Sequence, residues 1–174
     1  MQQTPREDAA ARRRVLLRAV RQMEWRRDGA VPWNHATAAV FASPDDLVLA
    51  LHARWHRILA VRLDPLLERG CTVDEVVAEW WSWAADTPGQ RAVLDAALTQ
   101  PTSELRRATD RQDALLAAAA GLVPAGTDVV LAADAWRFAL WSRADQLRRP
   151  ARFRTRCPGV QRWRCWRQDF GQAA

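Results

Sequence analysis

Two of the three histidines of this chain, His52 and His56, are four residues apart in the stretch LALHARWHRILAVRLD. On a helix, residues at this spacing lie on one face, one turn from each other. Imidazoles arranged in this way can bind a metal ion, contact a small ligand or respond to pH. At about 100° per residue, both histidines fall on the apolar side of their helix. We therefore expect the pair to face the protein interior.

A metal site is one interpretation of the pair. Zinc sites use three or four His, Cys or carboxylate ligands, so a further ligand is needed. His35, in the segment PWNHAT, is the remaining histidine, and it precedes the helix that carries the pair. The metal candidates are therefore His35, His52 and His56. The chain has no HExxH or ExxH pattern that would support them, and it predicts no bound metal or other cofactor.

Two other interpretations of the pair stay open. In the first, the histidines are packed in the core as neutral groups and form hydrogen bonds to the backbone or to a polar side chain such as Gln112. Alternatively, they line an internal cavity that binds a small apolar ligand or responds to pH. Tryptophans at nearby positions in the sequence could form the walls of this cavity. The candidate pocket then comprises His52, Trp55, His56, Trp83 and Gln112.

Catalysis has little support in the sequence. A GxSxG motif and a glycine-rich phosphate loop are both absent. Cys71 follows Gly70 beside a predicted helix start, but no base accompanies this thiol. The three cysteines show no CxxC spacing, which favours reduced thiols in a cytosol. We expect a non-catalytic protein.

Helix start and stop signals divide the chain into an all-α fold. Capping boxes are predicted at four helix starts, because a Ser or Thr is followed three residues later by Glu, Asp or Gln. Their first residues are Thr4, Ser43, Thr72 and Thr87. Glycines that end apolar-periodic runs, and Pro150 after the last run, predict the helix ends. The result is a six-helix bundle with short links. The predicted helices are 5–28, 44–69, 73–86, 88–98, 101–121 and 128–149.

The last two helices carry different apolar patterns. The fifth predicts a buried face that consists of Leu105, Ala108, Gln112, Leu115, Ala119 and Leu122. The last is apolar on nearly all sides, which is typical of a helix shared with a second subunit. We expect a homodimer whose interface includes Leu131, Phe138 and Trp141.

The positive charge is concentrated at the two ends of the chain. The net charge is +6, and every basic residue is Arg. Basic ends favour phosphate or acidic partners. In the first helix, the candidates for nucleic-acid contact are Arg12, Arg13, Arg14, Arg18 and Arg21. In the tail, arginines alternate with aromatic residues, which is typical of grooves that bind single-stranded nucleic acid. The candidates for nucleic-acid contact in the tail are Arg154, Arg162, Trp163, Arg164 and Trp166.

Length and composition are typical of one globular domain of 174 residues. We expect residues 1–149 to form this domain, with a basic first helix in 1–30 and a bundle in 41–149. Residues 150–174 form an Arg/Trp-rich tail that we expect to be disordered. No apolar run is long enough for a membrane helix, and the N-terminus lacks a secretion signal. We therefore expect a cytoplasmic protein without a membrane partner.

The segment VFASPDDLVLALHARW, residues 40–55, resembles the segment that follows the recognition helix in TetR-family regulators. Phe41, Ser43 and Leu47 match the family pattern, whereas Pro44 replaces its usual Lys. The remainder is similar to the helical effector half of actinobacterial members. The resemblance implies a dimeric regulator that binds a small ligand. Residues 30–40 are too few for the other two helices of a DNA-binding head, so helix-turn-helix reading of DNA is not expected.

The sequence thus favours a dimeric, non-catalytic helical regulator or small-ligand-binding protein. A nucleic-acid-associated protein that uses the basic first helix and the tail is the alternative. A metal-binding helical protein centred on the three histidines is the second alternative.

Overall fold

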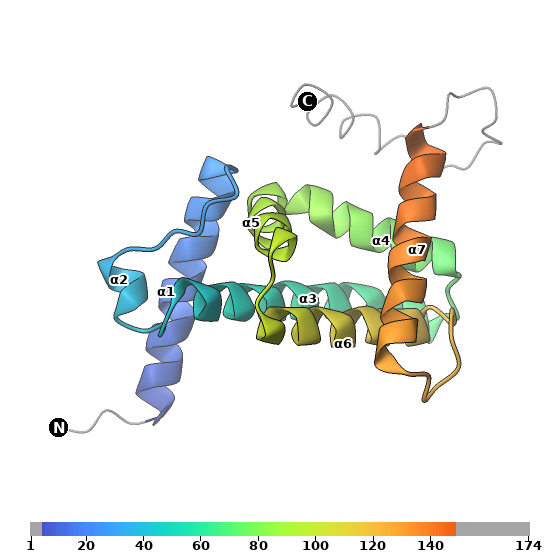
Figure 1. Ribbon diagram of the computed structural model, residues 1–174, viewed down its shortest axis with the longest axis horizontal. Coiled ribbons are helices and arrows are strands. Elements are labelled where there is room, and N and C mark those ends of the chain that lie inside the picture. The colour runs from blue at the N-terminus through green and yellow to red at the C-terminus, as the bar shows by residue number, and fades with distance from the viewer. Residues whose placement is uncertain (1–4, 149–174) are drawn as a thin grey trace. The chain divides into compact units, whose positions relative to one another are not determined.

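A computed structural model describes the backbone of residues 5–148 and the side chains of residues 8–144. The described residues form seven helices and no strand, which confirms the all-α prediction (Figure 1). The helices are α1 (Pro5–Arg26), α2 (His35–Ala38), α3 (Pro44–Glu68), α4 (Val73–Asp86), α5 (Pro88–Thr99), α6 (Ser103–Ala119) and α7 (Val129–Arg148). The chain divides into two compact units, residues 1–137 and 138–174.

The predicted number of six helices is wrong because α2 was missed. This helix has only four residues, which is too few for an apolar period to be visible. It is stabilised by a capping box, in which the Asn34 side chain accepts from the backbone N–H of Thr37 and the Thr37 hydroxyl accepts from that of Asn34. The segment between α1 and α3 therefore contains one short helix and not two long ones.

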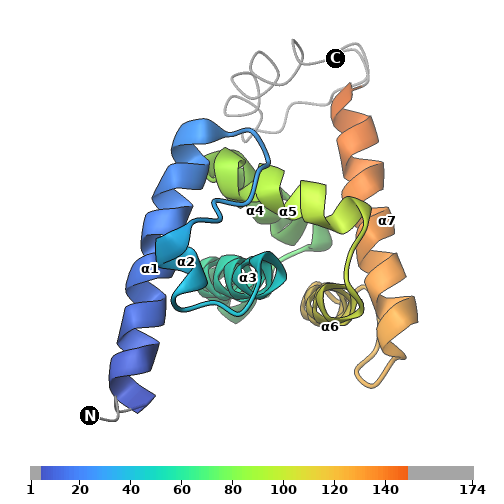
Figure 2. The same cartoon turned by 60° about the vertical axis from the view of Figure 1, so that its left-hand side comes forward.

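Helix α3 is the centre of the first unit and packs against α1, α4, α5 and α6 (Figure 2). Its start follows the sequence prediction, since the Ser43 hydroxyl accepts from the Asp46 N–H at 3.1 Å. Gly70 follows its last turn with φ of 73°, which is the left-handed conformation expected of a helix stop. The buried face of α3 consists of Leu47, Val48, Leu51, His52, Trp55, His56, Leu59 and Leu63.

The starts of α4 and α5 are both predicted correctly, but the side-chain cap predicted for α5 is absent. Thr72 and Glu75 form the expected capping box of α4. Thr87 makes no side-chain cap for α5, because its hydroxyl accepts from Trp55 Nε1 at 2.9 Å and donates to the Trp83 carbonyl at 2.7 Å. A carboxylate from α1 takes over the role, with Glu24 accepting from the backbone N–H groups of Gly89 and Gln90 at 3.0 and 3.2 Å.

This cap requires α1 and α5 to approach each other closely. Gly89 lies against the backbone of Met23 and Glu24, and a Cβ added at Gly89 would overlap the Met23 carbonyl. The Gln90 side chain donates to the Glu24 carboxylate at 2.8 Å, which further fixes the crossing. Only glycine fits at this position, because the neighbouring atoms belong to the backbone and cannot move aside as a flexible side chain could.

The buried face of α6 differs from the predicted one. Leu105, Asp113, Leu116 and Ala117 are buried, whereas Leu115 is 63% exposed. Asp113 occupies the buried face because Arg137 of α7 pairs with it at 2.9 Å and also binds Asp110. Burial raises the pKa of Asp113 to about 6, against the opposing effect of Arg137. This ion pair ties α6 to the beginning of α7 within the first unit.

The second unit is described as far as residue 148. In its part of α7, the rings of Phe138 and Trp141 have centroids 6.3 Å apart, and each side chain is 67% exposed. No helix among the described residues is long and apolar enough to cross a membrane. The predicted cap at Thr4 and the predicted tail, residues 150–174, lie outside the described residues, and the predicted division into 1–149 and 150–174 stays a prediction.

Candidate ligand-binding sites

The histidine pair lies inside the first unit, as its spacing predicts. His52 is 3% exposed and His56 is 7% exposed. Their ring centroids are 4.4 Å apart, with the ring planes tilted by 46°. The His56 ring also meets the edge of the Trp55 indole at 5.0 Å. The two imidazoles are therefore in direct contact with each other and with the aromatic core.

One hydrogen bond joins the pair to a neighbouring helix. The Thr109 hydroxyl of α6 lies 3.3 Å from His52 Nε2, and the tautomer of the ring decides which group donates. The predicted partner, Gln112, is half-buried one turn further along α6. Thr109 is the better placed group, because the buried face of α6 is rotated relative to the prediction.

The pair is neutral at pH 7. Burial lowers the pKa of His52 to about 4, and the positive charge of Arg91 contributes further. Burial also lowers the pKa of His56 to about 3, with additional effects from His52 and Arg91. Two imidazolium groups at this separation in the core would repel each other and lack hydration, so protonation is strongly disfavoured.

Trp55, which contacts His56, belongs to a cluster of indole rings with Trp80 and Trp83. Trp55 is completely buried, and its ring lies 5.6 Å from that of Trp80 and 6.1 Å from that of Trp83. Trp83 Nε1 donates to the Trp55 carbonyl at 3.3 Å. The Arg91 guanidinium lies 5.4 Å from the Trp55 and Trp80 ring centres. This arrangement satisfies the polar atoms of Trp55 and Trp83 and fixes their rings.

The metal interpretation is not supported by the geometry. Among the described residues, no group of three His, Cys, Asp or Glu side chains could hold a metal ion. His35 is exposed on α2, whereas His52 and His56 are buried on α3. The structure therefore does not bring the three predicted candidates together as a metal site.

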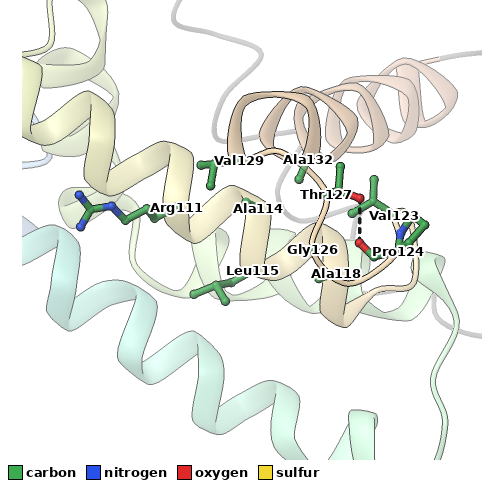
Figure 3. A pocket seen from close by; sticks show the side chains of 10 residues that line it. All are labelled: Arg111, Ala114, Leu115, Ala118, Val123, Pro124, Gly126, Thr127, Val129 and Ala132. Atoms are coloured by element: carbon green, nitrogen blue, oxygen red, sulfur yellow. Dashed lines mark hydrogen bonds between the residues drawn. The ribbon is translucent and has the colours of Figure 1, made fainter.

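A pocket of about 330 Å³ lies at a different place, between α6, the following loop and the first turn of α7 (Figure 3). None of the five predicted pocket residues lines it. Its lining is almost entirely apolar, and it lies within the first unit. The lining residues are Arg111, Ala114, Leu115, Ala118, Val123, Pro124, Gly126, Thr127, Val129 and Ala132.

The polar groups of this pocket are few. The Thr127 hydroxyl donates to the Pro124 carbonyl at 2.8 Å, so this donor is already used. Figure 3 shows the Arg111 guanidinium at the opposite end from Pro124 and Thr127. The sequence signal that indicates the pocket is the loop GLVPAGT, in which apolar Val123 and Pro124 lie between two glycines. Such a loop carries apolar side chains at a bend between two helices.

The basic candidates of the first helix fall into two groups. Arg12 is not available for nucleic acid as predicted, because its guanidinium pairs with Asp46, donates to the Val40 carbonyl and lies 4.4 Å from the Phe41 ring centre. The other four are exposed on α1, and they are Arg13, Arg14, Arg18 and Arg21. The tail candidates Arg154, Arg162, Trp163, Arg164 and Trp166 lie outside the described residues.

The candidates for a dimer interface are all exposed on α7. Leu131, in the first unit, is 65% exposed, and Phe138 and Trp141, in the second, are each 67% exposed. Large apolar side chains in water are unfavourable by about 25 cal/mol per Å². The helix therefore carries apolar surface that its own chain leaves uncovered among the described residues.

Comparison of the chain with protein-family models, curated proteins and solved structures found no match. The resemblance of residues 40–55 to TetR-family regulators thus stays a prediction from a short motif.

Proposed function

We propose that this protein is a non-catalytic regulator that binds a small, largely apolar molecule in the pocket between α6 and α7. The observation that carries this proposal is the pocket itself. It is a hollow open to solvent, its volume of about 330 Å³ lies at the lower end of the range of small-molecule sites, and nine of its ten lining residues are uncharged. An apolar ligand would gain affinity from the surface that it removes from water.

The composition of the lining supports binding and not catalysis. The ten residues include no carboxylate, imidazole or thiol, which are the usual groups for acid–base or nucleophilic chemistry. The one hydroxyl is engaged with a backbone carbonyl. The buried histidines belong to the core around α3 and are neutral at pH 7. The pocket is therefore equipped to recognise shape and apolar surface.

The position of the pocket supports a regulatory role. Its walls come from α6 and from Val129 and Ala132 at the start of α7. The Arg137 ion pairs with Asp110 and Asp113 join the same two helices. A ligand in the pocket would contact both helices and stabilise this pairing over alternatives. The TetR resemblance of residues 40–55, which implies the ligand-binding half of a regulator, is consistent with this proposal.

The pocket can be tested with a neutral apolar fluorophore, N-phenyl-1-naphthylamine. We expect the full-length protein to bind it with a rise in fluorescence, and Ala118→Trp to weaken binding at least about tenfold because the indole occupies the pocket. The matched control is Ala119→Trp, since Ala119 is also exposed on α6 but does not line the pocket. Equal weakening by both variants, or no binding by the wild type, would contradict the proposal.

We further propose that a second copy of the chain covers the exposed apolar side chains of α7. Leu131, Phe138 and Trp141 are each about two-thirds exposed, whereas core-facing residues of the same helix, Ala133 and Trp136, are completely buried. Aromatic side chains are enriched at subunit interfaces, where they bury large areas. Replacement of one of these apolar side chains by an acidic one should therefore prevent association of the two copies.

The expected solution mass is twice the 19.7 kDa of one chain, as measured by light scattering after gel filtration. Phe138→Glu should give a monomer, because a carboxylate would be buried without a partner at the interface. Val61→Glu is the control, since Val61 is an exposed apolar residue of α3 at 65% exposure. A monomeric wild type, or dissociation by both substitutions, would argue against this interface.

A further inference from the structure

We propose that α1 binds single-stranded nucleic acid through a row of four exposed side chains, Arg14, Arg18, Arg21 and Trp25, here called the α1 ridge. Their spacing of four, three and four residues places them within about 60° of one another around the helix axis. All four are exposed, and Trp25 is 82% exposed. The ridge runs for about 16 Å along α1, at 1.5 Å per residue.

The arginines of the ridge make no ion pair or hydrogen bond with another side chain in the described part of the chain. Among the described residues, no ion pair or hydrogen bond involves the side chains of Arg14, Arg18 or Arg21, whereas Arg12 pairs with Asp46 and Arg26 with Asp28. Arginines that stabilise a fold usually meet a carboxylate, as these two do. Three unpaired guanidiniums in a row therefore form a surface that favours an external anion.

Positive charge continues from the ridge toward α3. Burial lowers the pKa of Arg54, and the positive charge of Arg13 lowers it further, so these two guanidiniums lie close enough to repel each other. Arg54 remains in place because it donates to the Gln90 side chain at 3.1 Å. The fold thus holds like charges together at this position, where an anionic partner would relieve their repulsion.

Trp25 distinguishes nucleic acid from a merely acidic partner. An indole that is 82% exposed is unusual for tryptophan, which is buried to a large extent in most proteins. Single-stranded nucleic-acid sites combine arginines on phosphates with aromatic side chains on which bases stack. A duplex hides the faces of its bases, so Trp25 can stack only on an unpaired base. The chemistry recognised is that of phosphodiester groups and one or more unstacked bases.

A membrane surface does not fit the ridge. Helices that bind membranes insert an apolar face, but the apolar side of α1, formed by Ala19, Val20 and Met23, is buried against the rest of the unit. Figures 1 and 2 show α1 at the edge of this unit, where it crosses α3, and it also contacts α5. The face that remains accessible is the basic one.

The ridge is tested in the full-length protein with fluorescently labelled 12-nucleotide oligo(U) and oligo(dT), by anisotropy at several salt concentrations. Replacement of all three ridge arginines by Gln is expected to weaken binding at least about tenfold and to reduce the salt slope by about 2, at ~0.7 per phosphate contact. The control is Arg57→Gln with Arg106→Gln and Arg107→Gln, which removes the same charge from exposed positions of α3 and α6. Equal loss by both triple variants would overturn the proposal.

Base stacking is tested separately with Trp25→Ala. The wild type is expected to bind oligo(dT) about tenfold more tightly than an abasic strand of equal length, and Trp25→Ala to remove this difference while it leaves binding of the abasic strand unchanged. Binding that is equally tight for a duplex of the same length would overturn the assignment to single strands. Binding only to anionic vesicles or to a polyglutamate peptide would instead assign the ridge to a membrane or to an acidic protein.

Discussion

Acidification from pH 7 to pH 4.5 is expected to destabilise the protein by several kcal/mol, because of His52 and His56. Burial lowers their pKa values to about 4 and about 3, whereas an unfolded histidine titrates near 6.5. Between these values the unfolded chain binds more protons than the folded one. The contribution of the pair is therefore complete above about pH 6.5 and is lost as the pH falls toward 4.

The size of this effect follows from about 1.4 kcal/mol for each unit of pKa difference. Two buried histidines together give a loss of a few kcal/mol over this pH range, which is a sizeable part of the 5–15 kcal/mol that stabilises a typical domain. Asp113 opposes them, because its pKa is raised to about 6 and its contribution is lost as the pH rises through that value. One carboxyl group offsets only part of the effect of two imidazoles. The unfolding free energy is therefore still expected to fall on acidification.

The measurement is urea unfolding followed by tryptophan fluorescence at pH values from 4.5 to 7.5. His56→Leu is expected to reduce the slope of unfolding free energy against pH by about one proton, because one of the two buried imidazoles is removed. His35→Gln is the matched control, since His35 is exposed on α2 and should leave the slope unchanged. An unaltered slope in His56→Leu would show that the buried pair does not control acid stability.

Replacement of Gly89 by Ala is expected to lower the unfolding free energy by about 3 kcal/mol or more. The added Cβ would overlap the backbone carbonyl of Met23 where α1 and α5 cross. Overpacking of a tight contact typically costs 1–3 kcal/mol, and a backbone neighbour leaves little means of relief. Any separation of the helices would also break the hydrogen bonds from Gly89 and Gln90 to the Glu24 carboxylate.

The control for this substitution is Gly70→Ala. Gly70 has a positive φ of 73° but no neighbouring atom within 4 Å of the added Cβ, so only the backbone conformation is penalised, by about 1 kcal/mol. Urea unfolding of both variants separates the two effects. If Gly89→Ala were no less stable than Gly70→Ala, the close crossing of α1 and α5 would not be a major determinant of stability.

The helices could be predicted from the sequence because their limits are set by local chemistry. Ser43 and Thr72 cap the helices that follow them, and the glycine at position 70 ends α3 in the left-handed conformation. These signals act over a few residues, so they can be recognised without knowledge of the fold. The inward position of His52 and His56 likewise follows from helical periodicity alone.

The misassigned features depend on residues distant in the chain. Thr87 resembles an N-cap, but Trp55 and the Trp83 carbonyl use its hydroxyl, and Glu24 caps α5 from more than 60 residues away. Asp113 has the composition of a surface residue, yet it is buried because Arg137 pairs with it. The buried face of α6 therefore includes Asp113, and Leu115 is exposed at the pocket.

The candidate sites divide in the same way. The sequence by itself determined the all-α class, most helix limits, the buried histidine pair and the basic character of α1, because composition, periodicity and capping are local properties. The tertiary structure alone decided that Arg12 serves the fold, that Trp25 is left exposed and that the pocket lies between α6 and α7. These outcomes depend on contacts between side chains of different helices. Such contacts cannot be predicted from a short stretch of sequence.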